Sequence, residues 1–171
     1  MPLNANTRIA ATAAVIVVTD QLTKLWVQNW LPYMREFVII DGFFKLVHWG
    51  NTGAAWSLFR EHNEILAIIS VVALLALFLG RSHFDSGTAA GQVALGLLFG
   101  GIIGNLIDRL HADRRHVIDF IRFYLTRREG GEIGFPAFNI ADSAICIGVA
   151  LLFLLSWKHE SVKRPSGEAS S

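Results

Sequence analysis

The chain has 171 residues, of which 53% are hydrophobic and 17% are charged, and its mean hydropathy is +0.44. Because an average soluble domain is about 25% charged, this composition is typical of a membrane protein, and the length allows one compact domain. The formal net charge of +1 gives no reason to expect a nucleic-acid partner, and the single cysteine, Cys146, excludes an intrachain disulfide.

Four apolar stretches are candidate membrane spans, at about residues 9–30, 65–80, 89–107 and 137–157. A helix needs roughly 17–25 residues to cross the hydrocarbon core, so the second stretch is marginal unless it includes flanking residues. The start of the first stretch, the apolar run at residues 9–19, resembles a signal peptide, but Asp20, Lys24 and more apolar sequence follow this run instead of a small-residue cleavage site. We therefore interpret it as a retained helix.

A β-hairpin is predicted between the first and second spans. Two β-favouring runs at residues 37–49 are separated by Asp41-Gly42, and both positions of such a turn require a positive φ. Nearly every residue on both faces is apolar, which suits a sheet that lies against lipid or other protein. We expect a short amphipathic helix at residues 54–62, and the Gly- and Arg-rich residues 125–135 are typical of a loop.

The predicted fold class follows from these elements. We expect a membrane all-α protein with a small β element: four transmembrane helices, an interfacial β-hairpin or sheet, and the short amphipathic helix. Residues 1–171 would form a single integral-membrane domain with a flexible tail at 158–171. The third span carries Gly96, Gly100 and Gly104 at intervals of four, with Gly101 beside them, and such a face lets another backbone approach closely.

Short polar clusters stand at the ends of the predicted elements. Asp20 and Lys24 are four residues apart on the first helix, so they share a face and can form an ion pair. A second cluster, Asn51-Thr52-Gly53, follows the hairpin and has the composition of a turn. The third cluster ends the third span at positions i, i+3 and i+4 of one helix face, and consists of Asn105, Asp108 and Arg109.

Two further aspartates are the strongest indication of chemistry. Asp119 lies in Val117-Ile118-Asp119-Phe120, and Asp142 ends Phe138-Asn139-Ile140-Ala141-Asp142. A carboxylate near hydrocarbon is costly, roughly 2.5–3.5 kcal/mol at a helix centre. Two carboxyls that lie close together share a proton, because one must stay protonated while the other ionises, as in aspartic proteases.

Simpler explanations for these residues stay open on the sequence alone. Asp119 could form an ion pair with Arg122 or Arg115. Asn139 and Asp142 are three residues apart at the start of the fourth span, where an N-cap residue and a first-turn acid are common.

Other catalytic templates find no match. The chain has no His-Glu-x-x-His, no Gly-x-Ser-x-Gly and no phosphate-binding Gly-Lys-Ser/Thr motif. Its six histidines are scattered, and His111 and His116, five residues apart, have a weak metal-binding spacing. We therefore expect neither a metal nor a cofactor.

Five blocks of the sequence occur in one order that resembles the prolipoprotein signal peptidases, the type II signal peptidases of bacteria. They extend from Asp20 to Ser143, which is most of the chain. The blocks are Asp20-Gln21-Leu22-Thr23-Lys24, Asn51-Thr52-Gly53-Ala54-Ala55-Trp56, Gly101-Ile102-Ile103-Gly104-Asn105-Leu106-Ile107-Asp108-Arg109, Val117-Ile118-Asp119-Phe120 and Phe138-Asn139-Ile140-Ala141-Asp142-Ser143.

The resemblance implies an aspartic endopeptidase of the bacterial cytoplasmic membrane. Such an enzyme removes the signal peptide of a prolipoprotein just before its lipid-modified cysteine, so this peptide and membrane lipid are the implied partners, and we expect a monomer. By analogy, Asp119 and Asp142 are the catalytic pair. The surrounding shell implied by the resemblance is Asp20, Lys24, Asn51, Gly53, Gly104, Asn105, Asp108, Arg109, Asn139 and Ala141. The stretch 127–134 is longer and more charged than the family pattern.

The resemblance and the charge distribution predict opposite orientations. With four spans, both termini lie on one side of the membrane. That side carries five basic residues: Arg8, Arg81, Lys158, Lys163 and Arg164. The other side carries nine: Arg35, Lys45, Arg60, Arg109, Arg114, Arg115, Arg122, Arg127 and Arg128. The positive-inside rule alone would place these nine in the cytoplasm. We adopt the orientation of the family, with both termini cytoplasmic and the aspartates facing the outer side, where lipoproteins emerge.

Two other classes of function compete with this prediction. A small transporter or ion-pathway protein would also keep charged residues within its spans, but it would be expected to show internal repeats, and none is visible. A non-catalytic membrane scaffold would need the glycine face but neither Asp119 nor Asp142.

Overall fold

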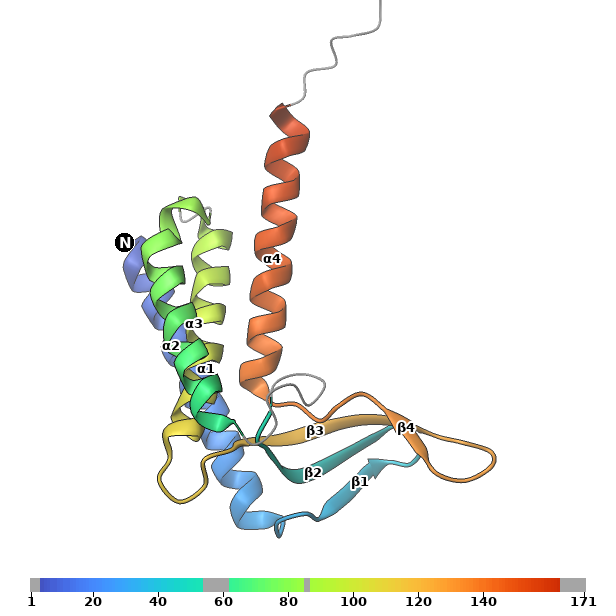
Figure 1. Cartoon of the computed structure of the whole chain (residues 1–171). Helices are drawn as coiled ribbons and strands as arrows, with labels where there is room; N and C mark the ends of the chain where they lie inside the picture. Colours follow the sequence, from blue (N-terminus) through green and yellow to red (C-terminus); the bar gives the residue numbers. More distant parts are fainter. Residues whose placement is uncertain (1–3, 54–61, 85–86, 164–171) are drawn as a thin grey trace, which may run out of the picture.

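The computed structural model describes residues 4–53, 62–84 and 87–163, and places four long helices above a four-stranded sheet (Figure 1). The helices are α1 (Ala5–Trp30), α2 (Asn63–Gly80), α3 (Ala89–Leu110) and α4 (Ile140–Lys163), with a 3-10 turn, η2, at Arg81–His83. All four are long and apolar enough to cross a membrane. The sheet contains β1 (Glu36–Ile40), β2 (Phe44–Asn51), β3 (Val117–Thr126) and β4 (Glu132–Gly134). This arrangement confirms the predicted fold class.

The short helix predicted at residues 54–62 falls, except for His62, outside the described residues. The fourth helix begins at Ile140, although its apolar stretch begins three residues earlier, because Phe138 first pairs with the sheet: its N–H and C=O both bond Ile121. At the other end, α4 continues to Lys163, past the start of the tail that we expected at residue 158.

Helix α3 is the centre of the membrane part. In the most apolar part of α3, 56% of the residues are buried. The corresponding share is 11–17% in the other three helices, whose outer faces are apolar and exposed. Helices with such faces are stable only where lipid covers them. The side chain of Thr88 caps the start of α3 by accepting a hydrogen bond from the N–H of Gly91, at 3.0 Å.

Glycines allow α1 and α4 to approach α3 closely on its two sides. A Cβ on Gly100 would lie 2.8 Å from the backbone oxygen of Ala13 in α1. On the other side, a Cβ on Gly101 would lie 2.5 Å from the backbone oxygen of Ala141 in α4. Neither contact leaves room for a side chain, so the expected close packing of backbones on the glycine face is confirmed.

The sheet is antiparallel, in the order β1-β2-β3-β4. The predicted hairpin at Asp41-Gly42 joins β1 to β2. Only Gly42 has a positive φ, of 72°, so the expectation of a positive φ at both positions was wrong. The N–H of Phe43 bonds the backbone oxygen of Ile40, which makes Gly42 the third residue of the turn, where glycine is favoured. Residues 125–135, which we expected to be a loop, instead form the end of β3, a turn with Gly130 and Gly131 at positive φ, and the strand β4. The expectation was wrong because β4 has only three residues, too few to show alternation in the sequence.

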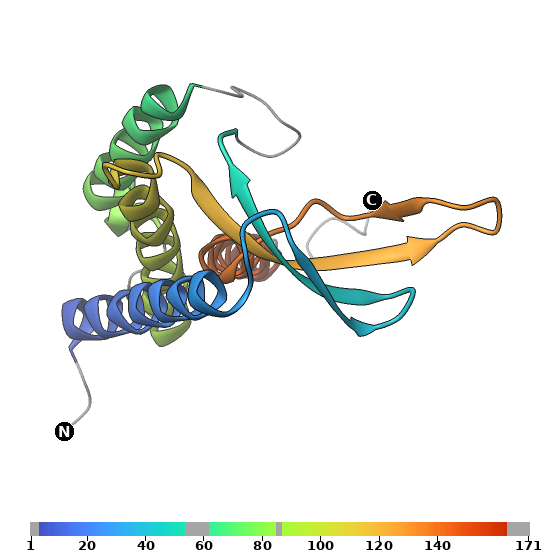
Figure 2. The same cartoon turned by 90° about the horizontal axis from the view of Figure 1, so that it is seen from below.

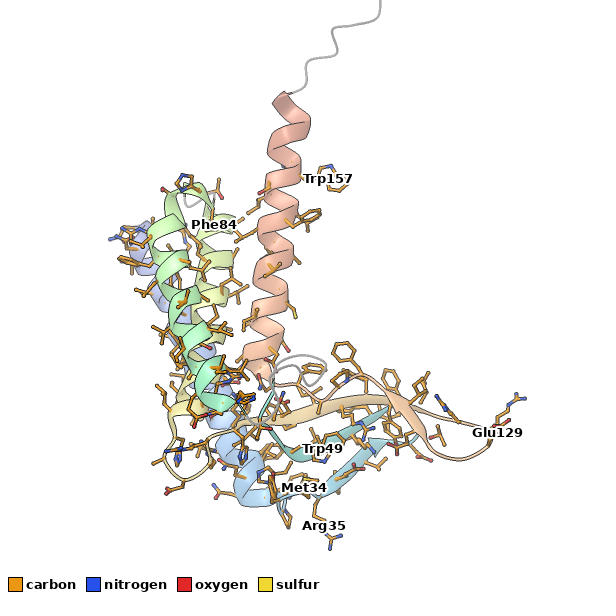
Figure 3. All side chains as sticks on the ribbon, in the orientation of Figure 1. Met34, Arg35, Trp49, Phe84, Glu129 and Trp157 are labelled. Carbon is orange, nitrogen blue, oxygen red and sulfur yellow. The ribbon has the colours of Figure 1, made fainter. Side chains whose placement is uncertain are left out.

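Four charged side chains, one from each strand, hold the sheet together. Lys45 of β2 is 1% exposed, and its Nζ lies 2.6 Å from Oε2 of both Glu36 in β1 and Glu132 in β4. Arg122 of β3 lies 3.5–3.6 Å from the same two carboxylates. The sheet projects sideways from the helices, and Glu129 marks the far end of the β3–β4 turn (Figures 2 and 3). This quartet therefore joins the two outer strands to the rest of the sheet where no helix covers them.

Candidate active site

The two candidate catalytic aspartates come from different elements and meet at Asn139. Asp119 lies in β3, and Asp142 lies in the first turn of α4. Nδ2 of Asn139 donates to Oδ1 of Asp119 at 2.9 Å, while the backbone N–H of Asn139 donates to Oδ2 of Asp142 at 3.3 Å. One residue thus binds both carboxylates, at the corner where the sheet meets the helices (Figure 1). We refer to Asp119 and Asp142 together as the dyad.

Asn139 also begins helix α4. Its Oδ1 accepts a hydrogen bond of 2.9 Å from the N–H of Asp142, and Asp142 returns a bond to the N–H of Asn139. This reciprocal pair is the geometry of a capping box, shortened to Asn and Asp. The N-cap explanation from the sequence is therefore correct for Asn139, but it does not account for the remaining oxygen of Asp142, which faces α3.

That remaining oxygen is bound by Asn105. Nδ2 of Asn105 donates to Oδ1 of Asp142 at 2.7 Å, and Oδ1 of Asn105 accepts a bond of 3.0 Å from Nζ of Lys24. The same Oδ1 accepts a bond of 3.2 Å from Nδ2 of Asn139. Asn105 therefore links a buried lysine of α1 to the dyad through its side-chain amide.

Lys24 is the centre of a second, fully buried cluster. Its Nζ lies 2.7 Å from Oδ2 of Asp20 and 2.8 Å from Oδ2 of Asp108, and all three side chains are at most 1% exposed. The predicted Asp20–Lys24 pair is present. Together with the bond to Asn105, these contacts use all three N–H donors of the ammonium group. A buried charge of this kind is tolerable only when it is paired and hydrogen-bonded in this way.

The backbone of the site is tied to this cluster. Oδ1 of Asp20 accepts a bond of 3.0 Å from the N–H of Ala141, which fixes the first turn of α4 against α1. Oδ2 of Asp108 accepts a longer bond, 3.4 Å, from the N–H of Ile118, next to Asp119. Position 104 must be a glycine because a Cβ there would lie 2.7 Å from Oδ2 of Asp20.

The cluster at the end of the hairpin contacts Asp119 directly. Nδ2 of Asn51 donates to Oδ2 of Asp119 at 2.9 Å, and Oδ1 of Asn51 accepts a bond of 2.9 Å from the N–H of Gly53. Asn51 therefore makes a turn, as its sequence indicated, and holds the carboxylate with the other end of its amide.

Arg109 is the least committed member of the predicted shell. Its Nη1 donates to the backbone oxygen of Asn105 at 3.3 Å, and its buried Nε has no hydrogen-bond partner among the described residues. Its own backbone oxygen accepts a bond of 2.9 Å from Nδ2 of Asn63. A guanidinium with unused donors beside two carboxyls is suited to contact a polar group of a substrate.

Three contributors were absent from the predicted set. Gln21 bonds the backbone oxygen of Gly104 at 3.1 Å and Oδ2 of Asp20 at 3.2 Å. Arg114 lies 3.5 Å from Oδ1 of Asp108, and Asn63 holds the end of α3 as described above. Gln21 stands beside Asp20 in the first of the five blocks that resemble the family, which was the only signal for it. The other two contacts depend on loops and on the start of α2.

The ion pairs considered for Asp119 do not form. Arg122 pairs with glutamates of the sheet, and Arg115 lies 3.4 Å from Glu64 at the surface. Asp119 is 3% exposed and has only amide partners among the described residues. Burial, together with the nearby charge of Asp142, raises the pKa of Asp119 to about 8, although the bonds from Asn51 and Asn139 oppose the shift. A carboxyl of this kind holds a proton at neutral pH.

Comparison with known proteins identifies the family. The family model for signal peptidase (SPase) II matches residues 12–158. The lipoprotein signal peptidase of Bacillus subtilis is 37% identical over 142 residues, which cover 83% of this chain and 88% of that protein. The lipoprotein signal peptidase of Nitratidesulfovibrio vulgaris is 34% identical over 165 residues, which cover 94% and 95% of the two chains.

Solved structures agree with the sequence matches. A bacterial membrane enzyme solved at 2.3 Å superposes with a TM-score of 0.77 at 31% identity, over 94% of each chain. A second bacterial membrane enzyme, solved at 1.9 Å, has a TM-score of 0.70 at 32% identity, over 86% of this chain and 91% of the other. The family model, the relatives and the four apolar helices lead to one conclusion: this chain is a multi-pass membrane protein that belongs to the signal peptidase II family of peptidases.

Proposed function

We propose that this peptidase removes the signal peptide from prolipoproteins by cleaving just before a lipid-modified cysteine, with Asp119 and Asp142 as its catalytic pair. The observation that supports this role is the binding of both carboxyls to Asn139. They belong to different elements and approach each other closely enough that the charge on one raises the pKa of the other, Asp119. The names of the relatives favour a peptidase over the transporter or the scaffold.

The chemistry follows from a shared proton. The ionised aspartate takes a proton from a water molecule, which attacks the scissile carbonyl carbon, while the protonated aspartate donates a hydrogen bond to the carbonyl oxygen. The proton that the base has gained then passes to the leaving amide nitrogen. Asn51, Asn105 and Asn139 keep the two carboxyls in place. Arg109, whose Nε has no partner among the described residues, binds the substrate backbone.

The proposed orientation places the dyad on the outer side of the cytoplasmic membrane and both termini inside. In this orientation the lipid chains of the substrate stay in the bilayer while its peptide bond reaches the corner between sheet and helices. Of the nine basic residues on the outer side, four are paired with carboxylates within 4 Å: Lys45, Arg114, Arg115 and Arg122. These ion pairs lower the net positive charge of the outer side, but the rule counts Lys and Arg residues whatever their partners, so the proposed orientation rests on the family and not on the charges.

Cleavage of a lipid-modified prolipoprotein by the purified protein, followed by gel shift, tests the proposal. We expect Asp119→Asn and Asp142→Asn each to lower turnover by at least about 10³-fold, because Asn keeps the shape of Asp but removes its acid–base function. Asp41→Asn, at the exposed hairpin turn, is the matched control and should cleave like the wild type. Turnover near the wild-type rate in either dyad variant would remove that residue from the catalytic pair.

A further inference from the structure

The two carboxyls of the dyad have unequal surroundings. Asp142 is bound by Nδ2 of Asn105 at 2.7 Å and by the N–H of Asn139, and it stands in the first turn of α4, where the helix dipole favours a negative charge. Asp119 stands on a strand, is 3% exposed, and receives Nδ2 of Asn51 and Nδ2 of Asn139. Asp142 is only half-buried. Burial therefore opposes ionisation more strongly at Asp119.

The amide donors to the two carboxyls also differ. Nδ2 of Asn51 donates to Asp119 alone among the described residues, at 2.9 Å, but the second donor to Asp119 is shared. Nδ2 of Asn139 is shared among three acceptors: Asp119 at 2.9 Å, and both Oδ1 of Asn105 and the backbone oxygen of Ile118 at 3.2 Å. Nδ2 of Asn105, by contrast, is directed to Asp142 alone among the described residues. Its amide is polarised from the other end because Oδ1 accepts a bond from the ammonium group of Lys24.

Lys24 also fixes which way the amide of Asn105 points. The ammonium group can only donate, and its three donors are used by Asp20, Asp108 and Asn105. The end of Asn105 that faces Lys24 must therefore be the oxygen, which leaves the N–H₂ end for Asp142. A flipped amide would place its donors against a cation and its oxygen against a carboxylate.

We infer that Asp142 is the ionised member of the dyad and Asp119 the protonated member, and that Lys24 is the positioning residue that sets this order through Asn105. This inference rests on the proposed function. The charged groups that face the dyad are Lys24 and Asp20 from α1, Asp108 and Arg109 from α3, and each carboxyl of the dyad itself. Asp142 is thus the base that activates water, and Asp119 the acid that contacts the scissile carbonyl. The pKa of Asp119, raised to about 8, agrees with this order.

The pH dependence of kcat/KM for prolipoprotein cleavage, in two matched variants, tests the inference. Such a profile is bell-shaped, with an acidic limb from the base and an alkaline limb from the acid. Asn105→Leu removes the donor to Asp142 and should move the acidic limb to higher pH by about one unit, with the alkaline limb unchanged. Asn51→Leu removes the donor to Asp119 and should move the alkaline limb to higher pH by about one unit, with the acidic limb unchanged. Exchange of the two effects would overturn the assignment.

A second measurement requires neither enzymatic activity nor a change in Asn51 or Asn105. Infrared difference spectra of the full chain in lipid, labelled with ¹³C-carboxyl aspartate, report a protonated carboxyl directly at neutral pH. The band should vanish in Asp119→Asn and persist in Asp142→Asn. A band that persists in Asp119→Asn overturns the inference. Failure of the proposed function looks different, because the wild type would then show the same infrared band but no cleavage.

Discussion

At the scale of single residues, the feature that sets this site apart is a lysine without contact with water. Lys24 forms ion pairs with two carboxylates, one from its own helix and one from α3, at 2.7 and 2.8 Å. Neither aspartate has a second cation as close, since Arg114 lies 3.5 Å from the other oxygen of Asp108. The stability of the whole corner therefore depends on one ammonium group.

Lys24→Met should destabilise the protein by about 3–5 kcal/mol, because it keeps the length of the side chain but leaves two buried carboxylates unpaired. Thermal unfolding in lipid or detergent measures the effect. Arg115→Gln breaks an ion pair whose side chains are 69% and 68% exposed, so it should leave the unfolding temperature almost unchanged. Equal losses in the two variants would mean that burial does not decide the value of an ion pair here.

Stability should also depend on pH through Asp119. Its pKa is about 8 in the folded protein and 3.8 in the unfolded chain, so the folded state keeps a proton that the unfolded state loses. The stability gained from this proton is complete below pH 3.8 and is lost as the pH rises through about 8. Asp119→Asn escapes this loss. Its unfolding temperature should be several degrees above that of the wild type at about pH 9 and nearly equal to it at about pH 4. The same difference in unfolding temperature at both pH values would contradict the raised pKa.

At the scale of elements, α3 organises the membrane part because its glycines serve two neighbours. Gly100 faces α1, and Gly101, the next residue, faces α4. The distance between α1 and α4 is therefore set by the thickness of a bare helix backbone. This distance matters for the site because Lys24 comes from α1 and Asp142 from α4.

Gly100→Ala tests this packing. Its Cβ would lie 2.7 Å from Cβ of Ile16 and 2.8 Å from the backbone oxygen of Ala13, so α1 must move outward. We expect a loss of about 1–3 kcal/mol in stability, measured by thermal unfolding, and a parallel loss of cleavage. Gly87→Ala is the matched control because nothing lies within 4 Å of its added Cβ. Unchanged stability of Gly100→Ala would show that α1 and α3 pack loosely enough to accept an added methyl group.

At the scale of the whole molecule, the sheet and the dyad occupy one end, and the start of α1 and the end of α4 lie at the other. The start of α1 and the far part of α4, marked by Trp157, both lie away from the sheet (Figures 1 and 3). A tryptophan near a helix end is typical of a membrane interface. In the orientation that we propose, this end lies in the cytoplasm.

Thiol labelling in intact cells tests this orientation. In a Cys146→Ala background, Arg128→Cys should react with a membrane-impermeant reagent, and Arg164→Cys should react only after the cells are opened. Retained cleavage of prolipoprotein in each variant shows that the labelled protein is folded. Reaction at position 164 but not at position 128 would mean that the positive-inside rule was right and the proposed orientation wrong.

The features predictable from the sequence were those that depend on short spacings. The turn at Asp41-Gly42 follows from local turn chemistry, and the Asp20–Lys24 pair follows from the geometry of one helix. The glycine face of α3 likewise follows from its period of four. In each case the residues that form the pattern are close in the sequence, although the glycine pattern does not tell which helices pack on it.

The centre of the site depends instead on packing between distant segments. Asn51 reaches Asp119 because β2 pairs with β3 in a register that includes an irregularity between Leu46 and Trp49. Lys24 reaches Asn105 only once α1 packs on α3. The resemblance to a family predicted these residues as one group, and the structure brings them into contact, but neither their spacing nor their composition could assign which amide binds which carboxyl.

Because Asp142 lies in the first turn of a membrane helix, the thickness of the surrounding bilayer should affect the proposed reaction directly. The apolar span of α4, Ile140–Lys158, has 19 residues, and at 1.5 Å per residue it is about 29 Å long, close to a hydrocarbon core of about 30 Å. A helix tilts or shifts to match the bilayer that holds it. Asp142 moves with this helix, whereas Asp119 belongs to the sheet. Lipids with shorter or longer acyl chains are therefore expected to alter the alignment of the two carboxyls, so that the same chain works at different rates in membranes of different thickness.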